Sequence, residues 1–274
     1  MKQVHEFRVQ RHPALGIEIV CARSARRFDR HTHEQFGIGI VTEGAQRSAS
    51  CAGQVEAQRG DVITVHPAEV HDGASLGPHA RAWQMLYLDP DLVADIALDR
   101  TEGAGTDYEF RSPVVRSPNL FSQCAQVLGQ AATASSSIAL ESLLITILGD
   151  ARRYQDRAPS QHGATPSPGI ARALSLMRDT PGASISLAEL ARQADLSRHQ
   201  LIRGVRAATG LTPHAYLVQC RVHMARRLIR EGVPLIDTAQ ACGFTDQSHL
   251  NRAFVRRFGL TPGAYAKASS AARA

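Results

Sequence analysis

The sequence lacks the features of a disulfide-rich, membrane-spanning or disordered protein. Its 274 residues include five cysteines, an odd number without a CxxC pair, which argues against a disulfide framework or a zinc knuckle. No run of 18 apolar residues occurs, and charges among the first dozen residues interrupt any signal-peptide core. Hydrophobic residues make up 43%, enough for a packed core. We therefore expect a folded, cytoplasmic protein without a membrane segment.

Lysine is scarce where positive charge is concentrated. Residues 169–274 hold 15 basic and 6 acidic side chains, and all thirteen basic residues before Lys267 are arginines. The remaining residues hold 16 basic and 19 acidic side chains. A basic C-terminal part beside a mildly acidic N-terminal part predicts a polyanion-binding domain attached to a domain of another kind. The planar guanidinium of arginine suits phosphates and guanine edges.

Proline, glycine and polar residues without apolar periodicity predict a linker at 155–169. Before it, 119–132 and 137–154 show the apolar spacing of two amphipathic helices, which we expect to form a hairpin. The second helix has more apolar residues than a barrel edge needs, which predicts a homodimer contact through this stripe: Leu140, Leu143, Leu144, Ile147 and Leu148.

Short alternating or apolar segments recur from about residue 4 to residue 88. Gly44, Gly53, Gly60 and Pro67 separate them at turn-like intervals. This pattern is typical of an all-β barrel or sandwich.

The residues after the linker contain an internal duplication. Positions 185–217 match positions 233–265 at an offset of 48 residues, which becomes 49 toward the end of the match. The change implies one inserted residue at the start of the second helix of the later copy. Residues 214–232, which connect the two copies, have the apolar spacing of one long helix.

Each copy has the residues of two helices joined by a tight turn. The first helix ends at a residue that tolerates the left-handed conformation, Asp195 in one copy and Gly243 in the other. A hydroxyl residue that can cap the next helix follows, Ser197 or Thr245. These features predict two helix-turn-helix motifs, whose second helices can lie in the major groove of DNA.

The duplication resembles the AraC/XylS family of bacterial transcription regulators, and the residues from Ala239 to Tyr265 match the family's C-terminal motif closely. The resemblance implies a regulator that binds double-stranded DNA and a small-molecule effector, and that contacts RNA polymerase if it activates transcription. It also implies DNA contacts from both recognition helices. The expected residues are Arg198, His199, Gln200, Arg203, Arg206, Gln247, Ser248, His249, Arg252 and Arg256.

The first copy departs from the family pattern. It has Gly204 and Val205 where the second copy has Ala253 and Phe254. Glycine inside a helix costs about 1 kcal/mol relative to alanine, and valine fills less space than an aromatic ring. We therefore expect the first motif to be looser and less discriminating than the second.

The N-terminal part resembles a cupin barrel, because His31 and His33, a later glycine and His71 follow the order of the two cupin motifs. Metal-dependent cupins have a glutamate where this chain has Gly37. Sensor domains of the AraC/XylS family are usually metal-free, so we expect neither metal nor cofactor. The resemblance implies an effector pocket in the barrel, with His31, His33, His71, Trp83 and Met85 as candidate contacts.

The predicted fold is an α+β multidomain chain. A cupin-like β-barrel with a helical hairpin occupies 1–154 and serves effector binding and dimerisation. After the linker, an all-α domain at 170–268 carries two helix-turn-helix motifs joined by a long helix.

Two catalytic alternatives are weaker. A metal-dependent cupin oxygenase or isomerase with an accessory DNA-binding tail would need the missing glutamate. A DNA-modifying enzyme with Cys220 as nucleophile would need an acid–base partner that the surrounding sequence does not supply. We therefore predict a protein that is not an enzyme.

Overall fold

The computed structural model describes residues 5–12, 15–50, 53–100, 108–133, 137–155 and 166–271. The chain divides into two compact units, of which one holds most of the strands with the first three helices and the other holds the remaining helices. Ten of the linker residues predicted at 155–169, 156–165, lie outside the described residues. Within the described part, every helix is too short or too polar to cross a membrane.

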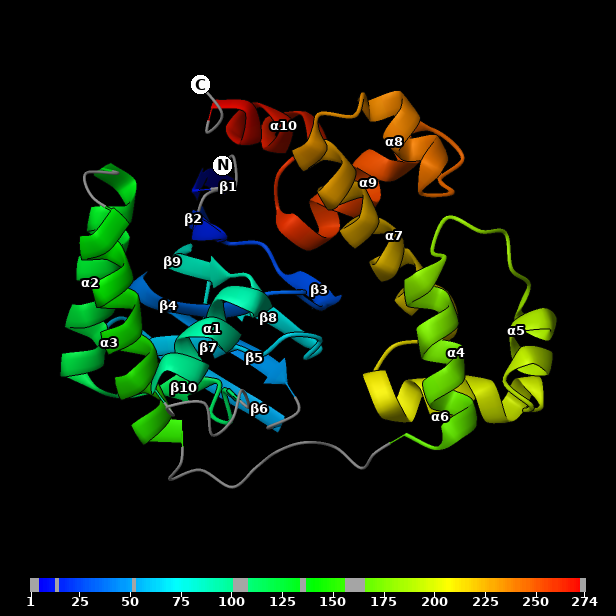
Figure 1. Ribbon diagram of the computed structural model, residues 1–274, viewed down its shortest axis with the longest axis horizontal. Helices are drawn as coiled ribbons and strands as arrows, with labels where there is room; N and C mark the ends of the chain where they lie inside the picture. Colours follow the sequence, from blue (N-terminus) through cyan, green and yellow to red (C-terminus); the bar gives the residue numbers. More distant parts are fainter. Residues whose placement is uncertain are drawn as a thin grey trace. The chain divides into compact units, whose positions relative to one another are not determined.

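The strands form two antiparallel sheets, as the predicted barrel or sandwich requires (Figure 1). The larger sheet has six strands in the order β1 (His5–His12), β2 (Ile17–Ser24), β9 (Arg81–Leu88), β4 (Phe36–Glu43), β7 (Val62–Val65) and β10 (Val114–Val115). The smaller sheet has four strands in the order β3 (Phe28–His31), β8 (His71–Ser75), β5 (Ala45–Ser50) and β6 (Gly53–Gln58).

Side chains of the large sheet alternate between two apolar environments, because successive strand residues point to opposite faces. On β4, Ile38 and Ile40 join the main core with residues of helices α2 (Pro118–Thr133) and α3 (Ser137–Gln155). Val41 belongs instead to the smaller core that includes Met85 and Tyr87 of β9. Helix α2 packs on β2, β4, β7 and β9, so the predicted helical hairpin covers one face of this sheet (Figure 1).

The expected helix pair is confirmed, but three helices were absent from the sequence prediction. Helix α1 (Pro90–Arg100) directly follows β9. Over the described residues 166–271 the second unit contains helices and no strand, and the first and last of these helices, α4 and α10, were not predicted from the sequence. Its seven helices are α4 (Pro168–Asp179), α5 (Leu187–Gln193), α6 (Arg198–Thr209), α7 (Pro213–Glu231), α8 (Leu235–Ala241), α9 (Gln247–Phe258) and α10 (Pro262–Ala271).

The duplication becomes two three-helix modules. We call α4, α5 and α6 the first module and α7, α8 and α9 the second module. Each recognition helix ends at a left-handed glycine, Gly210 (φ +69°) or Gly259 (φ +75°). A threonine hydroxyl then accepts from a backbone N–H to cap the next helix, and a proline begins that helix. The same four-residue segment, Gly–Leu–Thr–Pro, therefore follows the recognition helix of both modules.

An arginine–tyrosine hydrogen bond also joins the first helix of each module to the helix that follows that module. In the first, Arg178 Nη1 of α4 donates to the hydroxyl of Tyr216 at 3.3 Å. In the second, Arg226 Nε of α7 donates to the hydroxyl of Tyr265 at 3.0 Å. Arg178 is exposed whereas Arg226 is 3% exposed, so the second pair is a buried version of the first.

Candidate nucleic-acid interface and effector site

The left-handed residues predicted at the two turns are confirmed. Asp195 has φ +56° and Gly243 has φ +71°. The apolar residue after each one returns toward the helix before the turn, because Leu196 N–H donates to Ala191 O and Phe244 N–H donates to Ala239 O, both at 2.9 Å. Each turn therefore ends one helix and anchors the start of the next.

The two recognition helices begin at different caps. Ser197 caps α6 in a capping box, in which its hydroxyl accepts from Gln200 N–H and its own N–H donates to Gln200 Oε1 at 2.8 Å. Asp246 caps α9, accepting from His249 N–H at 2.7 Å. The prediction that Thr245 is the second cap is therefore wrong. Ser197 and Asp246 are 49 residues apart, so Thr245 occupies the position of the inserted residue.

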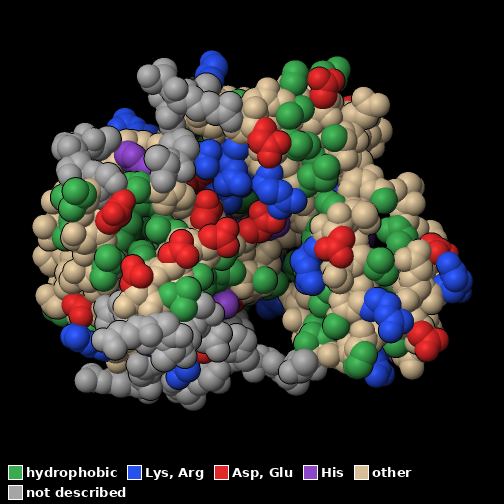
Figure 2. Space-filling model, viewed as in Figure 1, with side chains coloured by type: hydrophobic (Ala, Val, Ile, Leu, Met, Phe, Trp, Pro, Cys, Tyr) green, Lys and Arg blue, Asp and Glu red, His purple; other side chains and the backbone are tan. Residues whose placement is uncertain are grey.

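Most predicted DNA contacts are exposed on α6 and α9. The exposed members are Arg198, His199, Gln200, Arg203, Arg206, Gln247, Ser248, Arg252 and Arg256. Arg203 and Arg252 occupy equivalent positions, the sixth residue of each recognition helix. On the face seen in Figure 2, the part formed by α4–α6 carries basic side chains separated by acidic and apolar ones.

Two predicted DNA contacts already have local roles. The side chain of Gln200 completes the capping box at the start of α6. His249 is half-buried, and its ring lies edge-on to Phe244, with the ring centroids 5.1 Å apart. Both side chains help to position the recognition helices at their N-termini.

The first module is not loosened by its glycine. A Cβ on Gly204 would lie 2.2 Å from Ile170 Cδ1 and 2.5 Å from Ile170 Cγ1. Helix α4 therefore approaches α6 so closely that only glycine fits at this position. Val205 beside it is fully buried. The close packing of α4 on α6 argues against a loose first motif, whereas the expectation that this motif discriminates less between DNA sequences stays a prediction.

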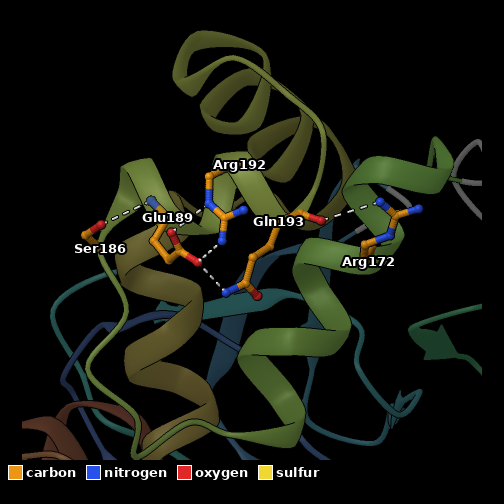
Figure 3. Close-up of polar contacts among 5 residues, drawn as sticks. All are labelled: Arg172, Ser186, Glu189, Arg192 and Gln193. Carbon is orange, nitrogen blue, oxygen red and sulfur yellow. Dashed lines mark hydrogen bonds and ion pairs between the residues drawn. The ribbon is translucent and has the colours of Figure 1, made fainter.

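Polar contacts on α5 brace the first module (Figure 3). Glu189 accepts hydrogen bonds from Arg192 and Gln193, each at 2.7 Å, and the bond from Arg192 is the larger cause that lowers the pKa of Glu189 to about 2. Ser186 caps this helix by accepting from Glu189 N–H at 3.1 Å. Arg172 of α4 donates to the backbone carbonyl of Gln193 at 3.4 Å. The contact of Arg172 joins α5 to α4, whereas the others stabilise α5 itself.

The inner face of the large sheet is closely filled beside Met85. A Cβ on Gly39 would lie 2.6 Å from Met85 Sδ, and one on Gly37 would lie 3.0 Å from Met85 Cε. Gly37 also borders Tyr87 Cε1, at 3.1 Å from such a Cβ. The two glycines of β4 therefore make room for large side chains of β9, and Met85 is 2% exposed.

Three of the five predicted effector residues converge. One ring nitrogen from each of His31, His33 and His71 lies within 4.8 Å of the others. The ring of His33 stacks on that of His71, with centroids 5.2 Å apart, and on that of Tyr87 at 4.7 Å. Three imidazoles are a donor set that zinc or iron accepts, with an open position left for water. The same polar cluster can equally hydrogen-bond an organic molecule.

The other two predicted effector residues, Trp83 and Met85, are not part of the histidine cluster. Trp83 packs edge-on to Phe7 and Phe28, with ring centroids 5.8 and 5.9 Å away. The guanidinium carbon of Arg81 lies 4.6 Å from the centroid of the Trp83 ring, and burial lowers the pKa of Arg81 to about 10. Met85 fills the space between this cluster and Tyr87 along β9.

The sequence analysis missed Tyr87 and Arg81. Both share the inner face of β9 with Trp83 and Met85, because every second residue of a strand points to the same side. The alternation of the stretch from Arg81 to Tyr87 was the signal that could have revealed them.

Comparisons with known proteins agree with both halves of this architecture. Residues 5–148 match the AraC-like ligand binding domain, and residues 190–268 match a helix-turn-helix domain. The chain belongs to the AraC family of transcription regulators. It is a transcription regulator with a DNA-binding helix-turn-helix domain and an N-terminal ligand-binding domain. Its family is one of transcription regulators.

Relatives of this AraC-family regulator extend over nearly the whole chain. The transcriptional activator RhaS of Pectobacterium carotovorum is 28% identical over 276 residues, covering 94% of this chain and 93% of RhaS. The uncharacterised regulator YbfI of Bacillus subtilis is 25% identical over 245 residues, covering 88% of each protein. The crystal structure of ToxT from Vibrio cholerae O395 has a TM-score of 0.61 at 12% identity, covering 92% of this chain and 98% of ToxT, and shows the shared fold.

The stripe predicted to form a dimer lies inside this AraC-family regulator. Leu140, Leu144, Ile147 and Leu148 are at most 4% exposed and belong to the core between α2, α3 and the large sheet. The prediction that this stripe contacts a second subunit is therefore wrong. The other side of α3 is exposed, including Ile138 at 76% and Ile145 at 37%.

Proposed function

We propose that this regulator recognises its operator with α6 and α9 in successive segments of the major groove, and that Arg203 and Arg252 read bases there. The equivalence of these two exposed arginines carries the proposal. Each lies one and a half turns into its helix, beyond the capped N-terminus. Arginine pairs with the O6 and N7 atoms of guanine through two hydrogen bonds. Arg206 and Arg256 lie further along the helices and suit phosphate contacts.

A base-by-base substitution series of a selected operator tests this proposal. The full-length protein first selects fragments from the source genome, which also identifies neighbouring genes. Arg203→Ala and Arg252→Ala should each remove about 1–3 kcal/mol of discrimination at one or two base pairs. Arg59→Ala, at an exposed arginine between β6 and β7, is the matched control and should leave the base preference unchanged. Uniform weakening on every sequence would instead mean that both arginines contact only phosphates.

We infer that a small organic effector binds inside the N-terminal domain at the histidine cluster. His33, His71 and Tyr87 support this, because their stacked rings offer both flat apolar faces and hydrogen-bonding atoms. A screen of metabolite classes by thermal shift would identify ligands that stabilise the full-length protein. His71→Phe should abolish the shift while His79→Phe, on the loop before β9, should retain it. A ligand that stabilises both variants equally binds elsewhere.

A metal-dependent enzyme is the alternative that the three histidines favour. Metal analysis of the purified protein, with turnover assayed after loading with iron, separates the two. We expect less than one metal ion per chain and no turnover, because the glutamate position of metal-dependent cupins is Gly37. Stoichiometric metal together with turnover would support the enzyme.

We also propose that the regulator is a cytoplasmic homodimer that contacts RNA polymerase if it activates transcription. Ile138 and Ile145 support a dimer contact, since they are seven residues apart and so share one exposed side of α3. Ile138→Glu with Ile145→Glu should give monomers by light scattering. A wild-type protein that is monomeric at micromolar concentration would contradict this part of the proposal.

A further inference from the structure

The side chain of Arg221, in the middle of helix α7, joins three backbone carbonyls. Its Nε donates to Pro181 O at 2.9 Å, its Nη1 donates to Gly243 O at 2.8 Å, and its Nη2 donates to Ala183 O at 3.4 Å. Pro181 and Ala183 belong to the connection between α4 and α5 in the first module. Gly243 is the left-handed residue at the turn of the second module. One guanidinium therefore holds both modules.

The two segments also touch each other directly. A Cβ on Gly182 would lie 2.2 Å from Ala241 O, and a Cβ on Gly243 would lie 2.7 Å from Gly182 O. Backbone packs on backbone here because both residues lack a Cβ. The glycine at the turn thus serves two purposes: it takes the left-handed conformation, and it admits the loop of the other module.

The hydrogen bonds of Arg221 fix backbone positions and do not pair opposite charges. Within the described part of the chain, its hydrogen bonds go to backbone carbonyls and no carboxylate pairs with it. Burial lowers its pKa, so removal from water is a cost that the three bonds must offset. The neighbouring Cys242 is fully buried, and burial raises the pKa of its thiol to about 11, so it remains neutral. A planar fork reaches acceptors in several directions, which an ammonium on a flexible stem does not reproduce.

We propose that Arg221 is a positioning residue that fixes the orientation of α6 relative to α9, and thereby the spacing of the two DNA half-sites, without contacting DNA. This inference rests on the proposed reading of DNA by both recognition helices. Arg221 donates to the loop that leads into α5 and to the turn that leads into α9. Without the guanidinium, the modules stay linked by α7 but lose their shared fixed point.

The test compares binding of the full-length protein to the whole operator, to each half-site alone, and to operators with one base pair added or removed between half-sites. Arg221→Met keeps the apolar stem and removes the donors. It should bind each half-site like the wild type and the whole operator about tenfold more weakly, because loosened modules lower the effective concentration of the second contact. It should also discriminate less between spacings. Arg230→Met, in the last turn of the same helix, is the control.

Salt dependence separates positioning from DNA contact. A lost phosphate contact lowers the slope of log affinity against log salt by about 0.9, whereas a lost positioning contact leaves the slope unchanged. A lower slope, or equal losses on half-sites and whole operator, would overturn the proposal. Gly182→Ala provides a second variant with Arg221 intact, and it should reproduce the relaxed spacing even if Arg221→Met folds poorly. If the wild type does not prefer the whole operator to a half-site, the proposal that both helices read DNA fails. If the wild type has this preference and the Arg221→Met and Gly182→Ala variants keep the same affinities and the same preference for spacing, only the role of Arg221 is refuted.

Discussion

The two modules follow the same path with different residues, and the difference shows how much freedom a helix-turn-helix has. The first module uses Asp195 in the left-handed position and a serine capping box. The second uses Gly243 and an aspartate cap one residue later in the alignment. Function requires the turn and the exposed helix start, which several residue types supply. At Gly243 the difference coincides with packing, because this residue lies against Gly182 of the first module.

Packing explains the glycines better than helix propensity does. Gly204 costs helix stability by itself, yet it allows α4 to approach α6, with Ile170 in the space that a side chain would take. The second module has Ala253 and the fully buried Phe254 at the equivalent positions. The two modules therefore fill the equivalent space in two ways. In the first module two helices approach closely, and in the second an aromatic ring fills the space.

The largest expected difference between the modules is at the left-handed residue. Gly243→Ala should destabilise the protein by about 3 kcal/mol, from a left-handed alanine of about 1–2 kcal/mol and an overpacking cost of about 1–3 kcal/mol. Asp195→Ala should cost about 1 kcal/mol, since the wild type already has a side chain there. Urea unfolding of the full-length variants measures both. Equal losses would mean that the contact of Gly243 with Gly182 is unimportant.

A smaller effect is expected at Gly204. Gly204→Ala should destabilise the protein by about 2 kcal/mol, because overpacking against Ile170 outweighs the gain in helix propensity of about 1 kcal/mol. Adding Ile170→Val, which shortens the obstructing side chain, should recover part of the loss. Stabilisation by the single variant would restore the view that the first module is loose. Unfolding by urea again supplies the measurement.

The smallest effect should separate the two arginine–tyrosine pairs. Tyr265→Phe removes the acceptor of the buried Arg226 and should cost about 1 kcal/mol or more. Tyr216→Phe removes the acceptor of the exposed Arg178, which water can replace, so its effect should stay below about 0.5 kcal/mol. Thermal unfolding of the two variants decides whether burial sets the difference.

Much of the fold was predictable because it depends on local patterns. The period of apolar residues located the α2–α3 hairpin, α7 and the paired helices. Helices α1, α4 and α10 were missed, and their roles depend on what they pack against. The exposure of the side chains proposed to contact DNA was predictable for the same reason, since exposure on a helix follows from its apolar side. The alternation of residues along β9 would likewise have predicted that Tyr87 and Arg81 lie on its inner face.

The sequence by itself determined the duplicated helix-turn-helix, the left-handed turns, the basic C-terminal domain and the β-rich N-terminal domain. Each of these depends on residues close together in the chain, whose conformational preferences and periodicity act locally. The tertiary structure decided that Gly204 is a contact with Ile170, that the α3 stripe faces inward, and that Arg221 links the loop of one module to the turn of the other. These depend on segments 22 or more residues apart, or on which side of a helix meets the core. Only the packed chain brings such atoms within van der Waals and hydrogen-bonding distance.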